Sequence, residues 1–251
     1  MKAMHSAFLA LLDRLEPKLA SPIAKEKNRF IKAAAARYLE HGTINFFDLV
    51  DTHQANVFDI LKPHWNMAIA GGGQLALGHI KSRQMKDDSE DSVFEDLTQQ
   101  WIATEGLKRS HSIAETSEAD VLDAISIGID DGLGTAEIGR AISAVTDLTP
   151  WRADTIARTE THNAASYGLR ESARDAQEKL GIDLEKAWAA TLDDRTRPAH
   201  AEMDDEDYIG MDEKFIVGGE EMDGPGDPAG SAENVCNCRC TLLIREAEPD
   251  V

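Results

Sequence analysis

The sequence of 251 residues predicts an α+β protein, with an extended helical N-terminal body and a small C-terminal α+β lobe of short antiparallel strands and long loops. Residues 1–180 carry apolar side chains at helical spacing almost throughout. After Gly181, short apolar or alternating runs typical of strands take over, separated by stretches rich in glycine, proline and aspartate. Hydrophobic residues make up 42% of the chain, which is enough to form a globular core.

Helix signals follow one another in the N-terminal part. The segment 1–20 predicts an amphipathic helix rather than a signal peptide, because charged residues interrupt its apolar patch. Ser21-Pro22 is suited to open a second helix, which His41-Gly42 ends. Helical spacing resumes at Phe46. The adjacent glycines 71–73 predict a break or bend, because three glycines would cost about 3 kcal/mol inside a helix.

A polar stretch without periodicity, residues 81–92, predicts a linker or exposed loop. Helical spacing then returns. Ser117, which acidic residues follow, is suited to cap one helix. Thr135 and Thr149 each begin another, and Gly181 stops the last.

Three segments of the C-terminal part predict strands. EKAWAATLDD (185–194) is typical of a strand closed by a turn. EKFIVGGEEM (213–222) predicts a strand or hairpin arm, and RCTLLIREA (239–247) a final strand. Together with the long loops between them, these segments define the lobe.

The net charge of −20 means that the chain repels nucleic acid over most of its surface. Acidic residues concentrate at 204–213 and 220–227. A solvated acidic face, a cation site and a docking surface for a basic partner all fit this pattern. No apolar run approaches the roughly 20 residues that span a bilayer, so no membrane contact is expected.

All three cysteines lie close together, at Cys236, Cys238 and Cys240. In a strand, which rises about 3.3 Å per residue, they would share one face with neighbouring Cα atoms about 7 Å apart. A disulfide is unfavourable at that separation, and both end sulfurs reach one zinc ion only if the backbone turns within the segment. Three alternatives remain: buried packing, a zinc site in which His200 supplies a further ligand, and a reactive thiol.

A cluster of charged residues crowds the turn before His200, namely Asp193, Asp194, Arg195, Thr196 and Arg197. Alternating acids and arginines can brace a loop through bidentate guanidinium–carboxylate bonds. They could also form a catalytic site with His200 as the base, but no convincing nucleophile or phosphate-binding loop accompanies them in the sequence. A polar patch at 158–163 inside an amphipathic helix predicts either hydrogen bonds to loops of the lobe or a partner-contacting face.

Three segments, taken in order, resemble one family. IARTETHNAASYG (156–168), WAATLDDRTRPAH (188–200) and GPGDPAGSAENVCNCRC (224–240), followed by an apolar strand, resemble the Mu F-protein-like domain. This domain occurs in minor head, or head morphogenesis, proteins of tailed bacteriophages, and the resemblance covers about residues 150–246. The motif residues that it implies are Arg158, Thr159, Glu160, Asp193, Arg195, Thr196, Arg197, His200, Asn237, Cys238, Arg239 and Cys240.

The resemblance implies a structural virion protein rather than an enzyme: a minor capsid component at the portal vertex, made in the host cytoplasm, that aids head assembly and DNA packaging or ejection. Residues 1–90 would be a helical arm docking on the portal or capsid, 91–149 a helical linker bundle, 150–246 the Mu F-like domain and 247–251 a tail. The implied partners are the portal protein and the major capsid protein, with packaged DNA only a weak partner. No cofactor is certain, and a structural zinc ion held by His200, Cys236, Cys238 and Cys240 is the one candidate.

Two other functions stay open. A metal-dependent hydrolase would use His200 with Asp193 and Asp194, and would need an open cleft on which these groups converge. A regulatory adaptor would bind host proteins through the acidic stretch 204–227. The structural hypothesis instead predicts that the polar groups bond to one another and are largely covered, and that the cysteines fasten the last strand beneath the turn at 193–200.

Overall fold

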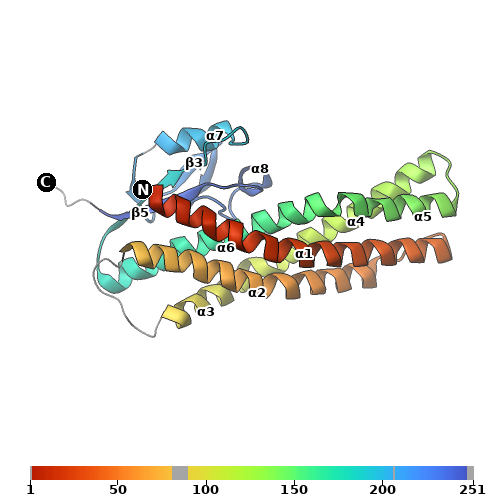
Figure 1. The fold of residues 1–251 in the computed structure, drawn as a ribbon, viewed down its shortest axis with the longest axis horizontal. Coiled ribbons are helices and arrows are strands. Elements are labelled where there is room, and N and C mark those ends of the chain that lie inside the picture. The colour runs from red at the N-terminus through yellow and green to blue at the C-terminus, as the bar shows by residue number, and fades with distance from the viewer. Residues whose placement is uncertain (1, 81–89, 206, 248–251) are drawn as a thin grey trace. The chain divides into compact units, whose positions relative to one another are not determined.

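Figure 1 shows the fold in a computed structural model, which describes residues 2–80, 90–205 and 207–247. Helices predominate up to Leu180 and short strands follow, which confirms the predicted α+β class. The long helices are α1 (Lys2–His41), α2 (Phe47–Ile80), α3 (Glu90–Trp101), α4 (Leu107–Asp130), α5 (Thr135–Ala144) and α6 (Thr149–Leu180). Shorter helical pieces are a π-helical turn (Ile102–Gly106), α7 (Pro198–Glu202), α8 (Ala232–Val235) and 3₁₀ turns (Val145–Leu148 and Met203–Asp205). None of the described helices is long and apolar enough to cross a membrane.

The chain forms two compact units. The first unit comprises residues 1–16, 64–101 and 158–251, and the second comprises residues 17–63 and 102–157. Each unit therefore combines segments that are distant in sequence. The predicted domains 1–90, 91–149 and 150–246 are instead each continuous in sequence. The roles predicted for those ranges stay predictions. The predicted linker at 81–92 lies outside the described residues except for its last three positions, which begin α3. Of the predicted tail, only Ala247 is described.

Two predicted helix starts are wrong. The helix α1 passes through Pro17 and Pro22 without a new start at Ser21, and Ser117 lies within α4 rather than at its N-terminus. Burial explains both results, because Ile23 and Ser117 have no exposed surface and tertiary packing overrides local capping preference. The helix end predicted at His41-Gly42 is confirmed, since Gly42 follows α1 with a φ of +67° that favours glycine.

The break predicted at glycines 71–73 is also wrong, because α2 continues through them. A Cβ atom on Gly72 would lie 1.9 Å from the carbonyl oxygen of Ala165 in α6. A Cβ atom on Gly168 of α6 would lie 2.1 Å from the carbonyl oxygen of Ile69 in α2. The glycines therefore let two helix backbones of the first unit touch, and this packing outweighs their poor helix propensity.

The lobe contains two small antiparallel sheets. The three predicted segments account for their strands except the short strand Ile209–Gly210, which was not predicted from the sequence. One sheet has the order β2-β1-β5, from β1 (Leu184–Ala189), β2 (Ile209–Gly210) and β5 (Thr241–Glu246). The other pairs β3 (Phe215–Val217) with β4 (Glu220–Met222). Gly218 and Gly219, both at positive φ, form the tight turn of that hairpin.

Trp188 of β1 is the centre of the lobe core. It is opposite Leu242 in the β1–β5 register, and its side chain is 1% exposed. The rings of Phe215 and His200 meet it edge-on, at centroid distances of 5.6 and 5.3 Å. This packing fixes His200 beside the segment that leads into β5.

Candidate functional site

A pocket of about 330 Å³ opens in the first unit at the cysteine segment. It is lined by Arg158, Thr191, Asp193, Arg195, Thr196, Arg197, His200, Asn237, Cys238, Arg239 and Cys240. The lining thus contains every motif residue implied by the family resemblance except Thr159 and Glu160. The pocket is rich in arginine although the chain as a whole is strongly acidic.

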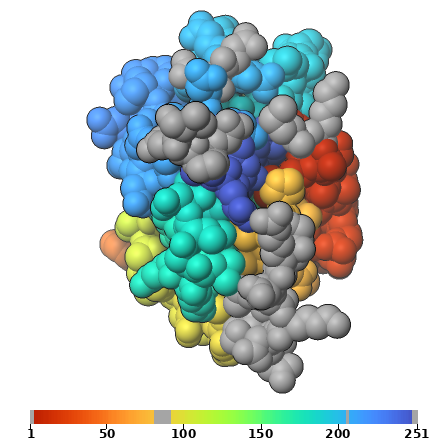
Figure 2. All heavy atoms as spheres, turned by 90° about the vertical axis from the view of Figure 1, so that its left-hand side faces the viewer, coloured from red at the N-terminus to blue at the C-terminus, as the bar shows by residue number. Residues whose placement is uncertain are grey.

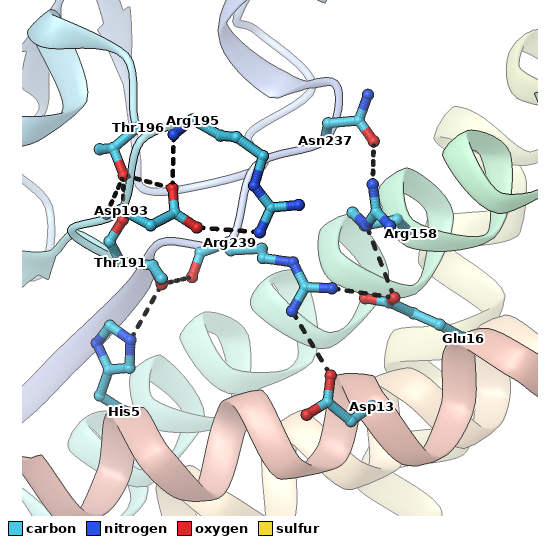
Figure 3. A network of polar contacts seen from close by, with 10 residues as sticks. All are labelled: His5, Asp13, Glu16, Arg158, Thr191, Asp193, Arg195, Thr196, Asn237 and Arg239. Carbon is cyan, nitrogen blue, oxygen red and sulfur yellow. Dashed lines mark hydrogen bonds and ion pairs between the residues drawn. The ribbon is translucent and has the colours of Figure 1, made fainter. Parts of the chain in front are cut away.

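The turn after β1 is closed by its own side chains (Figure 3). Asp193 accepts hydrogen bonds from the backbone N–H and the guanidinium of Arg195, at 2.9 and 3.0 Å. These bonds lower the pKa of the Asp193 carboxyl below its ordinary value. The hydroxyl of Thr196 donates to the carbonyl of Thr191 and accepts the backbone N–H of Asp193. The guanidinium of Arg197 donates to the carbonyl of Cys236 at 2.7 Å, which ties the turn to the cysteine segment.

The other two arginines of the pocket pair with acids of α1. Arg239 lies 3.5 Å from Asp13 and 3.4 Å from Glu16, and Arg158 lies 3.7 Å from Glu16. Arg158 also donates to the side-chain oxygen of Asn237 at 3.0 Å. The start of α1 (red) and the lobe (blue) are both visible on the face shown in Figure 2. The first turns of α1 therefore form part of the site.

A second polar contact joins α1 to the same pocket wall. His5 lies 3.1 Å from the hydroxyl of Thr191, which donates to the carbonyl of Arg239 at 2.7 Å (Figure 3). Neither these α1 residues nor Thr191 is among the site residues predicted from the sequence. The only available signal was the pair of acids Asp13 and Glu16, which lie three residues apart and share a helix face.

The cysteines do not lie on a strand face, so that geometric expectation is wrong. Strand β5 begins only at Thr241, and the chain turns at Asn237, whose φ is +56°. The turn brings the sulfurs of Cys238 and Cys240 to 3.7 and 3.5 Å from Nδ1 of His200. These three side chains are buried and their donor atoms all lie within 4.8 Å of one another. Cys236, the fourth predicted metal ligand, is not part of this group.

The two buried thiols titrate as a pair. The hydrogen bond with Cys240 lowers the pKa of Cys238, and the same contact together with burial raises the pKa of Cys240 far above its ordinary value. One thiol of the pair is therefore more acidic than an ordinary cysteine, and the other is less acidic. A thiolate beside an imidazole can bind a soft metal ion or act as a nucleophile.

The polar patch of α6 is internal and holds the cysteine segment in place. The hydroxyl of Thr159 accepts the backbone N–H of Asn237 at 3.1 Å, and Nε2–H of His162 donates to the carbonyl of Cys240 at 2.7 Å. Glu160 accepts the indole N–H of Trp65 at 3.0 Å. Burial lowers the pKa of His162, which favours the neutral imidazole. Thr159 and Glu160 thus support the site without lining it.

Many acids of the stretch 204–227 are used inside the lobe. Asp204 accepts the backbone N–H of Ala190 at 2.7 Å. Asp227 accepts the backbone N–H groups of Asp223 and Ala229, and Glu220 accepts that of Ser231. These carboxylates fix loops, so the stretch is not simply a solvated acidic face.

Comparison with known proteins places this site in a family. Residues 119–243 match the family described as Phage Mu protein F like protein. This part of the chain is a Mu F-like domain. The match confirms the resemblance to tailed-phage head morphogenesis proteins, and it begins within α4, further upstream than residue 150.

Two curated relatives are similar to the chain. The NAD(+)--arginine ADP-ribosyltransferase EFV of Enterococcus faecalis is 35% identical over 136 residues, which are 54% of this chain and 27% of that protein. The Minor head protein GP7 of Bacillus phage SPP1 is 33% identical over 137 residues, which are 52% of this chain and 43% of that protein. The chain thus spans less than half the length of each relative. No solved structure matches the chain.

Proposed function

We propose that the chain is a structural component of a tailed-phage head that acts at the portal vertex and aids head assembly, with DNA packaging or ejection as later steps. The observation that carries this proposal is the Mu F-like domain, together with the similarity to a protein named minor head protein. The ADP-ribosyltransferase relative shares little more than a quarter of its length with this chain, so its named activity is not carried over.

The arrangement of the site supports a structural role, in which these residues hold the last strand in place, better than a role in hydrolysis. The hydrolase alternative needs His200, Asp193 and Asp194 to converge on one point. Among the described residues, the group that could hold a metal ion contains His200 with two cysteines and neither aspartate. Asp193 is occupied by Arg195 and Thr196, and Asp194 does not line the pocket. The pocket gives room for a ligand, but these acids are not arranged around it as a catalytic pair.

The charge of −20 favours partners with basic surfaces, which we propose are faces of the portal protein or the major capsid protein. DNA is a secondary partner at most, since most of the surface repels phosphate. The adaptor alternative gains no support from the structure, because acids such as Asp204, Glu220 and Asp227 are bonded within the lobe.

The experiment is to purify particles of the phage or prophage that encodes the chain and to measure the chain against the portal protein by quantitative mass spectrometry. We expect a low, fixed ratio to the portal protein and density at the portal vertex in a reconstruction without icosahedral averaging. Heads assembled without the gene, which keep their portal, are the matched control for that density. A chain absent from washed particles, but captured with host proteins in infected cells, would instead support the adaptor function.

A further inference from the structure

We propose that His200, Cys238 and Cys240 bind a zinc ion through Nδ1 and two thiolate sulfurs, with the fourth coordination position open to the pocket that they line. Two elements supply the ligands. His200 lies on α7, which Pro198 begins, and the cysteines lie in the turn before β5. This inference concerns the chemistry of the lobe and does not depend on where the chain sits in a particle.

The two nitrogen–sulfur distances fit a tetrahedral ion. With Zn–S bonds of about 2.3 Å and a Zn–N bond of about 2.05 Å, tetrahedral angles place nitrogen and sulfur about 3.6 Å apart. The observed distances from Nδ1 of His200 to the two sulfurs are 3.7 and 3.5 Å. The three donor atoms also all lie within 4.8 Å of one another.

Hydrogen bonding alone explains this geometry less well. A ring nitrogen has one hydrogen or one lone pair in the ring plane, so it can make one good hydrogen bond. Nδ1 of His200 instead faces two sulfurs at nearly equal distances. A central ion accounts for both contacts at once.

The surroundings also suit a thiolate–metal site. The backbone N–H of Cys240 points at the sulfur of Cys238 at 3.4 Å, and such bonds favour the charged form of the acceptor. The ring of Trp188 packs edge-on against His200 and holds its orientation, as outer groups do around bound metals. His200, Cys238 and Cys240 are each at most 3% exposed, yet all three line the pocket. Water or an anionic donor from the pocket can complete the coordination.

The test is to measure zinc bound to the full-length chain, purified under reducing conditions, equilibrated with zinc and separated from free metal by gel filtration. We expect about one zinc per chain. Cys238→Ser and Cys240→Ser should lower the zinc affinity by more than the roughly 10- to 100-fold that loss of an outer contact costs. Cys236→Ser, the matched control, changes a cysteine of the same segment outside the group and should keep the zinc.

A second measurement, with cobalt in place of zinc, distinguishes the loss of a metal ligand from a failure to fold. Wild-type protein loaded with Co²⁺ should show sulfur-to-cobalt charge-transfer absorption, which is weaker in each folded single variant of Cys238 or Cys240 and unchanged in Cys236→Ser. Circular dichroism of each protein reports folding. Wild-type protein that is folded and binds neither zinc nor cobalt would overturn the proposal. So would equal loss of metal in Cys236→Ser and Cys238→Ser.

Discussion

At the residue scale, a chain of polar contacts crosses the interior of the second unit. Nδ1 of His53 lies 2.8 Å from Glu26, and Nε2 of His53 lies 3.1 Å from the hydroxyl of Ser117, which accepts Lys27 at 2.7 Å. The order serine–histidine–carboxylate is that of a hydrolase triad. His53 and Ser117 have no exposed surface, so the contacts stabilise the helices rather than serve a substrate.

This network makes stability depend on pH. Burial alone would raise the pKa of Glu26, but hydrogen bonds from Arg29, His53 and Asn56 outweigh it and lower the pKa from 4.5 to about 2. The unfolded chain therefore binds more protons than the folded chain between those values, and stability is lost as the pH falls through this window. Burial also lowers the pKa of His53, so protonation in the unfolded chain begins to cost stability below about pH 6.5.

We expect Glu26→Gln to lower the free energy of unfolding at pH 7 by about 1–3 kcal/mol, because charge-assisted hydrogen bonds are lost. The difference from wild type should narrow as the pH falls from 5 to 3, and urea unfolding at several pH values measures it. Glu40→Gln changes an exposed carboxylate on the same helix and should leave the pH dependence unchanged. Parallel curves for wild type and Glu26→Gln would contradict this assignment.

Local sequence signals located part of the candidate site and missed another part. Asp193, His200 and the cysteines could be identified because their chemistry is concentrated in short segments. His5 and Glu16 could not, since spacing along α1 shows which residues share a face but not which distant loop that face meets. The turn at Asn237, which brings the two sulfurs together, depends on hydrogen bonds with Arg158 and Thr159 of α6. Strand periodicity gives no sign of such a turn.

At the element scale, the close approach of α2 and α6 is the main departure from sequence-based expectation. Glycine propensity predicts a break, and Pro22 predicts a helix start, because both rules describe a helix in water. In the folded chain Gly72 faces the backbone of Ala165 and Leu169, where any side chain would collide. Propensity rules fail at such positions because the packing partner is absent from the local sequence.

We expect Gly72→Ala to destabilise the protein by about 2–3 kcal/mol or more, since the added methyl group meets a backbone carbonyl that cannot move aside easily. Gly78→Ala is the matched control on the same helix, because nothing lies within 4 Å of the position that its methyl group would take. It should be neutral or stabilising by about 0.5–1 kcal/mol. Thermal unfolding of both variants measures the contrast, and equal effects would show that the helices do not pack as described.

At the scale of the whole molecule, the part of the Mu F-like domain that lies in the first unit packs against segments from outside the domain. The aromatic ring of Phe8 meets His162 edge-on at 5.7 Å, and Trp65 donates to Glu160. Segments 1–16 and 64–101 thus cover the same helix that supports the cysteine segment. The range 150–246, read from the sequence as one domain, lacks these covering segments.

We therefore expect a fragment of residues 150–251 to lack a cooperative thermal transition and to be cleaved rapidly by protease, whereas the full chain resists. The physical reason is that the fragment would expose apolar surface of α6 and would lose contacts such as the hydrogen bond from Trp65 to Glu160. Supplying residues 1–101 as a separate chain should restore protection, because that piece carries both missing segments of the first unit. Residues 17–63 supplied alone are the control and should not restore it. A fragment 150–251 that unfolds cooperatively by itself would contradict this prediction. It would show that the fragment folds autonomously and does not need its contacts with α1 and α2.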